Sequence, residues 1–265
     1  MTEFFGAGWK DIKRATVNIT LPLYLAKADI RQRYRRSTLG PFWITISTGV
    51  MVACIGVIFG SLFKSPMSEF LPFLTVGLII WGYISSTITE ATTVFVSAEP
   101  IIKQLPLALT THVYRMIARN IYIFFHNIMI FPVVLLCVKR SINFEIFWFI
   151  PGFTLLTLNL IWLSLLLGIV CSRFRDLTQI VASVLQIFFY VTPIIWMPSL
   201  LPKRTSVMIL DPNPMYHLLQ IVREPLMGNS PTALNWAVST LICLVGWLMV
   251  IQLFNKFRSR IAYWL

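Results

Sequence analysis

A group of arginines near the N-terminus is the first set of residues whose type and spacing could do chemistry. They stand directly before a long apolar run and are Arg31, Arg33, Arg35 and Arg36. Guanidinium groups bind phosphate oxygens in a forked geometry, and basic clusters also hold a protein at the surface of an anionic bilayer. Such a group could therefore bind nucleic acid, anchor a membrane helix or hold an anionic substrate.

The motifs of ATP-hydrolysing and metal-dependent enzymes are absent from the sequence. No GxxxxGK[ST] motif occurs, so we expect no ATP site in this chain. The acidic residues are scattered without a DxD pair, and His112, His126 and His217 have no metal-ligand spacing. We therefore expect no catalytic residue, no metal and no cofactor in this chain, with any ATP and Mg²⁺ bound by a partner subunit.

The composition indicates a membrane protein. Of the 265 residues, 57% are hydrophobic and only 12% are charged, whereas about a quarter of the residues in a soluble domain are charged. The net charge of +12 comes from basic residues that lie between apolar stretches rather than on one domain. We interpret this charge as membrane topology and exclude nucleic acid as a partner.

Six apolar stretches approach the about 20 residues that a membrane-spanning helix needs. An even number of spans places both termini on one side, and most of the 22 lysine and arginine residues fall on that side. Because such residues are retained in the cytoplasm, we expect both termini there. The predicted spans are Pro41 to Phe63, Phe70 to Phe95, Ile117 to Val138, Ile146 to Val170, Thr178 to Trp196 and Leu234 to Phe254. They form one all-α domain over residues 41–254, followed by a tail over residues 255–265.

Two further segments are apolar but not suited to span a membrane. Within residues 1–40, Ala7 to Ala28 mixes charged and apolar positions and predicts an amphipathic helix at the membrane interface, interrupted at Pro22. The connection after the fifth span contains two short apolar helical patterns, Ser206 to Leu210 and Met215 to Leu226. We expect re-entrant helices here, which must pack against protein or line a cavity.

Polar residues within the predicted spans allow two interpretations. Glu90 lies among threonines in the second span and either faces a pathway or locks two helices together. His126 and Asn127 in the third span either form a hydrogen bond between helices or line a pathway.

Three blocks of sequence, in this order, resemble the membrane subunit of ABC-2 type polysaccharide exporters. They are "RQRYRRSTLGPFW", "SRFRDLTQIVASVLQIFFYVTPIIW" and "LDPNPMYHLLQIVREPLMG". The resemblance covers nearly the whole chain. It implies a homodimer in the bacterial inner membrane, bound to two cytoplasmic ABC ATPase subunits. The implied substrate is a lipid-linked polysaccharide such as O-antigen, capsule or teichoic acid.

The same resemblance implies where the ATPase docks. The cytoplasmic connection Ser97 to Met116 should include the coupling helix, although an ordinary interfacial loop is the alternative. A smaller contact is expected in the fourth connection. The expected coupling residues are Pro100, Ile101, Ile102, Lys103, Gln104, Leu105, Arg173, Arg175 and Asp176. The turn at Asp211, Pro212, Asn213, Pro214 and Tyr216 is the expected external gate.

The arginine group and the aromatic residues then acquire candidate roles. Arg31, Arg33, Arg35 and Arg36 could bind the pyrophosphate of a lipid-linked polysaccharide, or they only orient the protein and bind anionic lipid. Ser37 or Thr38 could cap a helix that starts at Pro41. Aromatic rings stack on sugar faces and could line a channel, although simple packing is the alternative. The candidate rings are Phe42, Trp43, Trp81, Tyr83, Phe188, Phe189, Tyr190 and Trp196.

Two rival functions remain open from the sequence. An ABC-2 exporter of a drug or another lipid would share the topology. A membrane transferase or ligase acting on lipid-linked glycans would need a catalytic base outside, for which only Asp211, His217 and Glu224 are available. For Asp211 we favour capping of a re-entrant helix.

Overall fold

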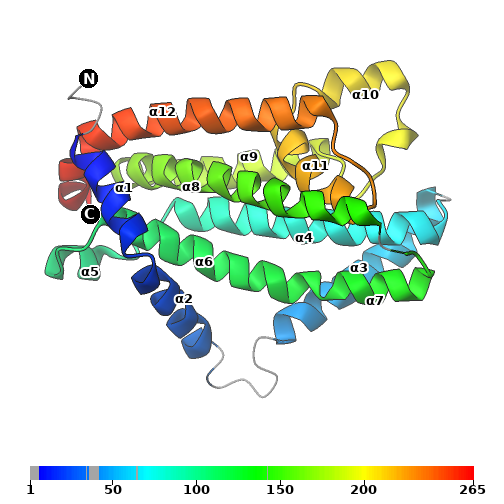
Figure 1. The fold of residues 1–265 in the computed structure, drawn as a ribbon, viewed down its shortest axis with the longest axis horizontal. Coiled ribbons are helices and arrows are strands. Elements are labelled where there is room, and N and C mark those ends of the chain that lie inside the picture. The colour runs from blue at the N-terminus through cyan, green and yellow to red at the C-terminus, as the bar shows by residue number, and fades with distance from the viewer. Residues whose placement is uncertain (1–5, 34, 36–41, 64, 142) are drawn as a thin grey trace.

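The structure is a computed structural model that describes residues 6–33, 35, 42–63, 65–141 and 143–265. Within these residues the chain forms helices joined by turns, with no strand (Figure 1). Five helical segments are long and apolar enough to cross a membrane. They are α3 (Phe42–Phe63), α4 (Met67–Ala91), α6 with α7 (Leu109–Ile128 and Ile130–Val138), η1 with α8 (Phe144–Trp148 and Phe149–Arg173), and α12 (Ala233–Trp264). The expected all-α membrane fold is confirmed.

The fifth predicted span is shorter than expected. It forms α9, which covers Leu177–Val191. The helix ends because Thr192 precedes Pro193, and a residue before proline is displaced from the helical conformation. Thr192 accordingly has an extended backbone. At 1.5 Å per residue α9 is about 22 Å long, less than the about 30 Å of hydrocarbon in a bilayer.

Helix α4 is the centre of the fold. It contacts α3, α6, α7, α8, α9 and α11, and 78% of its most apolar stretch is buried. For α3 the corresponding fraction is only 11%, with Val57, Ile58 and Leu62 exposed. An apolar face of this size within one chain is left to contact lipid or another protein chain.

The N-terminal segment forms two helices rather than one. Helix α1 covers Ala7–Val17, and α2 covers Thr20–Arg33. The break falls just before Pro22, since proline fits the first turn of a helix but not its interior. Helix α1 packs on α12 and α2 packs on α6. The end of the molecule with α1, α5 (Glu99–Gln104) and the C-terminus is called the terminal end below (Figure 1).

The opposite end holds the two short helices that follow α9. A 3₁₀ turn, η2 (Pro198–Leu200), and α10 (Lys203–Leu210) lead into α11 (Pro214–Leu226). Helix α11 packs against α4, α8 and α12. This packing satisfies the requirement that a re-entrant helix contacts protein rather than lipid.

The cap of α11 corrects one sequence interpretation. Asn213, not Asp211, is the N-cap, because Pro214 occupies the first helical position and the cap must precede it. The side-chain oxygen of Asn213 accepts hydrogen bonds from the backbone nitrogens of Met215 (3.0 Å) and Tyr216 (3.3 Å). Its Nδ2 donates to Thr192 Oγ1 (3.0 Å), which ties α11 to the end of α9.

Candidate functional site

A polar cavity of about 350 Å³ lies at the terminal end, between α2, α4 and α6. It borders the turn that leads from α4 into α5, the segment expected to couple to an ATPase. Its charged and ionisable lining residues are Asp29 of α2, Glu90 of α4, and His112, Arg115 and Arg119 of α6. The hydroxyl-bearing side chains of Thr93 and Ser97 complete its polar wall.

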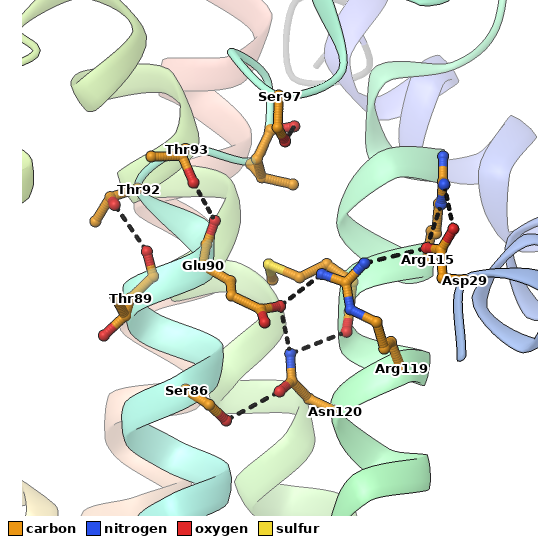
Figure 2. A network of polar contacts seen from close by, with 12 residues as sticks. Asp29, Ser86, Thr89, Glu90, Thr92, Thr93, Ser97, Arg115, Arg119 and Asn120 are labelled. Atoms are coloured by element: carbon orange, nitrogen blue, oxygen red, sulfur yellow. Dashed lines mark hydrogen bonds and ion pairs between the residues drawn. The ribbon is translucent and has the colours of Figure 1, made fainter. Parts of the chain in front are cut away.

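A chain of ion pairs crosses this cavity (Figure 2). Arg115 binds both carboxylate oxygens of Asp29, with 2.7 Å between Arg115 Nε and Asp29 Oδ2. Arg119 bridges two acids, because its Nη1 lies 3.1 Å from Asp29 Oδ2 and its Nη2 lies 2.7 Å from Glu90 Oε2. Helix α2 is thereby fastened to α6, and α6 is fastened to α4.

Neutral side chains extend the same network along α4. Asn120 Nδ2 donates to Glu90 Oε2 (2.9 Å), and Ser86 Oγ donates to Asn120 Oδ1 (2.9 Å) (Figure 2). Glu90 of α4 therefore joins α4 to α6 through Arg119 and Asn120. These contacts match the helix-locking interpretation of Glu90, and Glu90 also lines the polar cavity.

The arginines keep Asp29 ionised. Burial of the Asp29 carboxyl favours its neutral form, but hydrogen bonds and charge from Arg115, then charge and a hydrogen bond from Arg119, outweigh burial and lower its pKa. Because the pKa is lower in the folded state, the ion pair stabilises the fold above the ordinary pKa of an aspartate. That stabilisation is lost as the pH falls through the lowered pKa.

Removal of Glu90 tests how strongly the network joins α4 to α6. We expect Glu90→Ala to lower the free energy of unfolding by about 1–2 kcal/mol, because Arg119 and Asn120 each lose a charge-assisted hydrogen bond at a partly exposed site. The measurement is the unfolding midpoint of the purified protein, followed by tryptophan fluorescence. Glu99→Ala is the control, since Glu99 makes only an exposed pair with Lys103. An equal loss in both variants would contradict the prediction.

A second polar centre at the terminal end surrounds Asp11. This α1 residue is buried, and its carboxylate accepts hydrogen bonds from Leu109 N (3.1 Å), Thr110 N (3.0 Å) and Thr110 Oγ1 (2.9 Å). Arg258 Nε of α12 lies 2.7 Å from Asp11 Oδ2. Helix α6 has Ala108 at its N-cap, which offers no side-chain acceptor. Asp11 therefore caps α6 from a distant helix.

The sequence interpretation did not single out Asp11, which it counted among the polar positions of the interfacial helix. One signal was available, because α6 has no capping residue of its own and must find an acceptor elsewhere. Asn255 acts in the same way on α1. Its Oδ1 accepts hydrogen bonds from Gly8 N (2.8 Å) and Trp9 N (3.2 Å), and so holds the start of α1 on α12.

The expected coupling residues lie in two places. Helix α5 comprises Glu99–Gln104, with Pro100 in its first turn and no buried residue. Ile101 and Ile102 are half-buried, and Leu105 directly after the helix is 53% exposed. Lys103 pairs with Glu99 at 2.6 Å, and Gln104 is exposed. An exposed helix with apolar side chains has the form that a docking element requires.

The second expected contact lies between α8 and α9. Arg175 and Asp176 are exposed in this turn. The guanidinium of Arg173 lies 5.1 Å from the ring centre of Phe174 and 5.6 Å from that of Trp264 in α12. The turn therefore contacts the C-terminal helix, and its role in docking stays a prediction.

The arginine group is only partly described. Arg31, Arg33 and Arg35 are exposed, so their guanidinium groups are accessible to lipid or substrate. Arg36 and the expected cap at Ser37 or Thr38 lie outside the described residues.

The candidate channel aromatics do not share one environment. Phe42, Trp43 and Tyr190 are exposed, whereas Phe188, Phe189 and Trp196 are half-buried. Trp81 and Tyr83 are buried inside the single chain, and Tyr83 packs against the rings of both Phe124 and Phe153. For Tyr83 the structure thus shows packing, while the exposed rings remain candidates for a channel.

The expected gate residues form an ordered turn rather than a loose loop. His217 is buried, with its Nε2 2.8 Å from the backbone oxygen of Asp211 and its Nδ1 2.8 Å from Asn235 Oδ1. Tyr216 packs edge-on against His217. Pro212 and Pro214 flank the Asn213 cap.

Arg223 lies in α11, within the predicted re-entrant pattern Met215 to Leu226, and the sequence interpretation gave it no structural role. Its side chain is fully buried. Its Nη1 donates to Pro193 O (2.6 Å), its Nε donates to Gln220 Oε1 (2.9 Å), and its guanidinium stacks 4.1 Å from the ring centre of Phe73. Arg223 thereby joins α11 to α4 and to the segment after α9.

Comparison with known proteins identifies the class of this chain. The ABC-2 type transporter family matches residues 22–227, and the chain belongs to this family. It is 22% identical to the O-antigen export system permease protein RfbA of Klebsiella pneumoniae over 249 residues, which cover 91% of this chain and 93% of the relative. The protein of the same name from Myxococcus xanthus is 21% identical over 236 residues, or 83% and 90% of the two chains. The resemblance seen in the sequence is confirmed.

Proposed function

We propose that this protein is the membrane-spanning permease of an ABC exporter that moves a lipid-linked polysaccharide of the O-antigen or capsule type across the bacterial inner membrane. The observation that supports it most is the similarity to O-antigen export permeases over about nine-tenths of both chains. Five helices that are long and apolar enough to cross a membrane also support a role as a membrane-spanning subunit.

The proposal includes partners that the chain requires. ATP is hydrolysed by two cytoplasmic ABC subunits, because the sequence has no nucleotide-binding motif. The permease acts as a homodimer, and the largely exposed apolar helix α3 and the exposed side of α9 offer surfaces for a second copy. Both termini face the cytoplasm, as the distribution of basic residues indicates.

The connection from α5 into α6 supports a mechanical link between the ATPase and the spans. Helix α6 begins five residues beyond the last residue of α5, and its first turn is held by Asp11. The next turns carry Arg115 and Arg119, which hold α2 and α4. A displacement of α5 by ATP-driven closure of the ATPase is thereby passed to three helices at once.

Reconstitution tests the function. The permease and the ATPase encoded beside it are placed in liposomes, and ATP hydrolysis is measured with lipid-linked polysaccharide, with polyprenyl phosphate alone and with drug-like substrates. Stimulation by the polysaccharide, with its appearance on the far side, supports the proposal. Stimulation by drugs or other lipids alone would favour a different ABC-2 exporter, and a permease that neither binds nor stimulates the ATPase would favour a glycan transferase.

A single substitution tests the coupling segment. We expect Leu105→Asp to weaken binding of the ATPase at least tenfold, since a charge would be placed in an apolar contact. Met208→Asp is the matched control, because Met208 is also exposed but lies in α10 at the opposite end. Binding is measured by titration of the purified subunits. Equal affinity of both variants would remove Leu105 from the docking surface.

A further inference from the structure

An apolar groove of about 540 Å³ opens on another side of α6 from the polar cavity. It is bounded by the N-terminal helices, α6 and α8. Its lining is nearly all hydrocarbon, with Ile19, Leu23, Ile117, Ile121 and Phe125 contributing most of the large side chains. The only polar groups are hydroxyls, and two of them bond to each other, since Thr16 Oγ1 lies 3.0 Å from Tyr114 OH.

The position of the groove along the membrane-spanning helices determines which kind of molecule can occupy it. Its walls at Ile117, Ile121 and Ile161 belong to helices long and apolar enough to span a membrane. In a bilayer these positions face hydrocarbon and not water, and an apolar groove there is filled by an acyl or prenyl chain.

The exposed charged side chains of the described N-terminal helices are all basic. The two acids of the described N-terminal helices, Asp11 and Asp29, point inward to Arg258 and to Arg115. The basic side chains Lys13, Lys27 and Arg31 are exposed, and none of them has an ion pair within the described part of the chain.

These cations lie on the helices that bound the groove, within one or two turns of its lining residues Thr16 and Leu23. Residues four apart lie on one face of a helix, so Lys27 and Arg31 follow Leu23 along α2. Lys13 stands one turn before Thr16 in α1. A hydrocarbon slot with exposed cations one or two helical turns away matches a lipid with an acyl chain and an anionic head group.

We propose that this groove holds an anionic phospholipid of the surrounding bilayer, with one acyl chain against α6 and α8 and its phosphate at Lys27 and Arg31. A transported lipid has similar chemistry. The resident phospholipid is favoured because no residue of α3 or α9, the helices with exposed apolar faces, lines the groove. The proposal goes beyond the export function and depends only on the membrane location.

Lipid binding to the purified permease tests the proposal. The delipidated protein is offered equal amounts of phosphatidylglycerol and phosphatidylcholine, and bound lipid is counted by native mass spectrometry. We expect the wild type to prefer phosphatidylglycerol. In the double variant K27Q/R31Q this preference should fall at least tenfold, because two basic contacts near a membrane surface contribute at least that much to the binding of an anionic lipid. The control K256Q/R260Q removes two cations from the same end of the molecule and should keep the preference.

A second variant tests the hydrocarbon slot. Ala118 lines the groove, and Ala118→Leu would fill part of it. We expect weaker binding of both lipids. Equal binding of the two lipids to the wild type would overturn the proposal, as would equal losses in K27Q/R31Q and K256Q/R260Q. Recovery of a prenyl diphosphate lipid, and no phospholipid, from the untreated protein would assign the groove to the substrate instead.

Discussion

Replacement of Asp11 by alanine is expected to lower the free energy of unfolding by about 3 kcal/mol, the low end of the cost of removing one partner of a buried ion pair. The low end applies because Arg258 is partly exposed and can be solvated again. The loss also includes an N-cap, since the backbone nitrogens of Leu109 and Thr110 would have no acceptor. The apparent unfolding temperature in nanodiscs should fall clearly.

Two further variants separate the cap from the ion pair. Asp11→Asn keeps an oxygen for the first turn of α6 but removes the charge that faces Arg258, so its loss should be smaller than that of Asp11→Ala. A double-mutant cycle with Arg258→Gln should give a coupling free energy of about 1 kcal/mol or more. If Asp11→Ala unfolds at the wild-type temperature, Asp11 does not hold α1, α6 and α12 together.

Features set by local sequence were predicted well. Long apolar runs gave the five long spans, because hydrocarbon thickness fixes the length of a spanning helix. The two re-entrant patterns correspond to α10 and α11, whose ends are defined by the prolines at 202, 212 and 214. The short α9 could also have been foreseen, since Pro193 limits a helix before it.

Features set by distant partners were not predicted. Asp11 and Arg258 are 247 residues apart, and Asp29 and Arg115 are 86 apart. Hydropathy and helical spacing show which face of a helix is apolar, but they do not show which polar residue of another helix it meets. Composition alone therefore made both acids look like ordinary members of a basic interfacial segment.

The surroundings of Arg223 were likewise not predictable from the sequence. The sequence places Arg223 in an apolar re-entrant pattern, but it does not show which groups surround the guanidinium. Its burial depends on Gln220, one turn earlier in α11, and on Pro193 and Phe73, which only the fold brings to it. Two of its nitrogens, Nε and Nη1, donate hydrogen bonds and its flat face is stacked on a ring, which helps a buried guanidinium to be tolerated. In contrast, Nη2 has no hydrogen-bond partner in the described part of the chain.

A close contact between α8 and α11 gives the second large prediction, Gly152→Ala. Gly152 of α8 faces the backbone of α11, and a Cβ atom there would lie 2.1 Å from Ile221 O and 2.9 Å from Ile221 C. No side-chain rotation relieves a clash with backbone, so α11 must move away from α8. We expect a loss of about 3 kcal/mol, the upper part of the range for overpacking. The Nη1 of Arg223 should also lose its contact with Pro193 O, because both belong to this packing.

Gly82→Ala is the matched control, and it should change stability in the opposite direction. Gly82 also lies inside a spanning helix, α4, but it is exposed and a Cβ there would meet no atom within 4 Å. Alanine exceeds glycine in helix propensity by up to about 1 kcal/mol, so this variant should be as stable as the wild type or more stable. Both variants are compared by their unfolding midpoints. Equal unfolding midpoints of the two variants would show that α8 and α11 are not in backbone contact. They would also show that α11 is not packed against the other helices as its buried residues indicate.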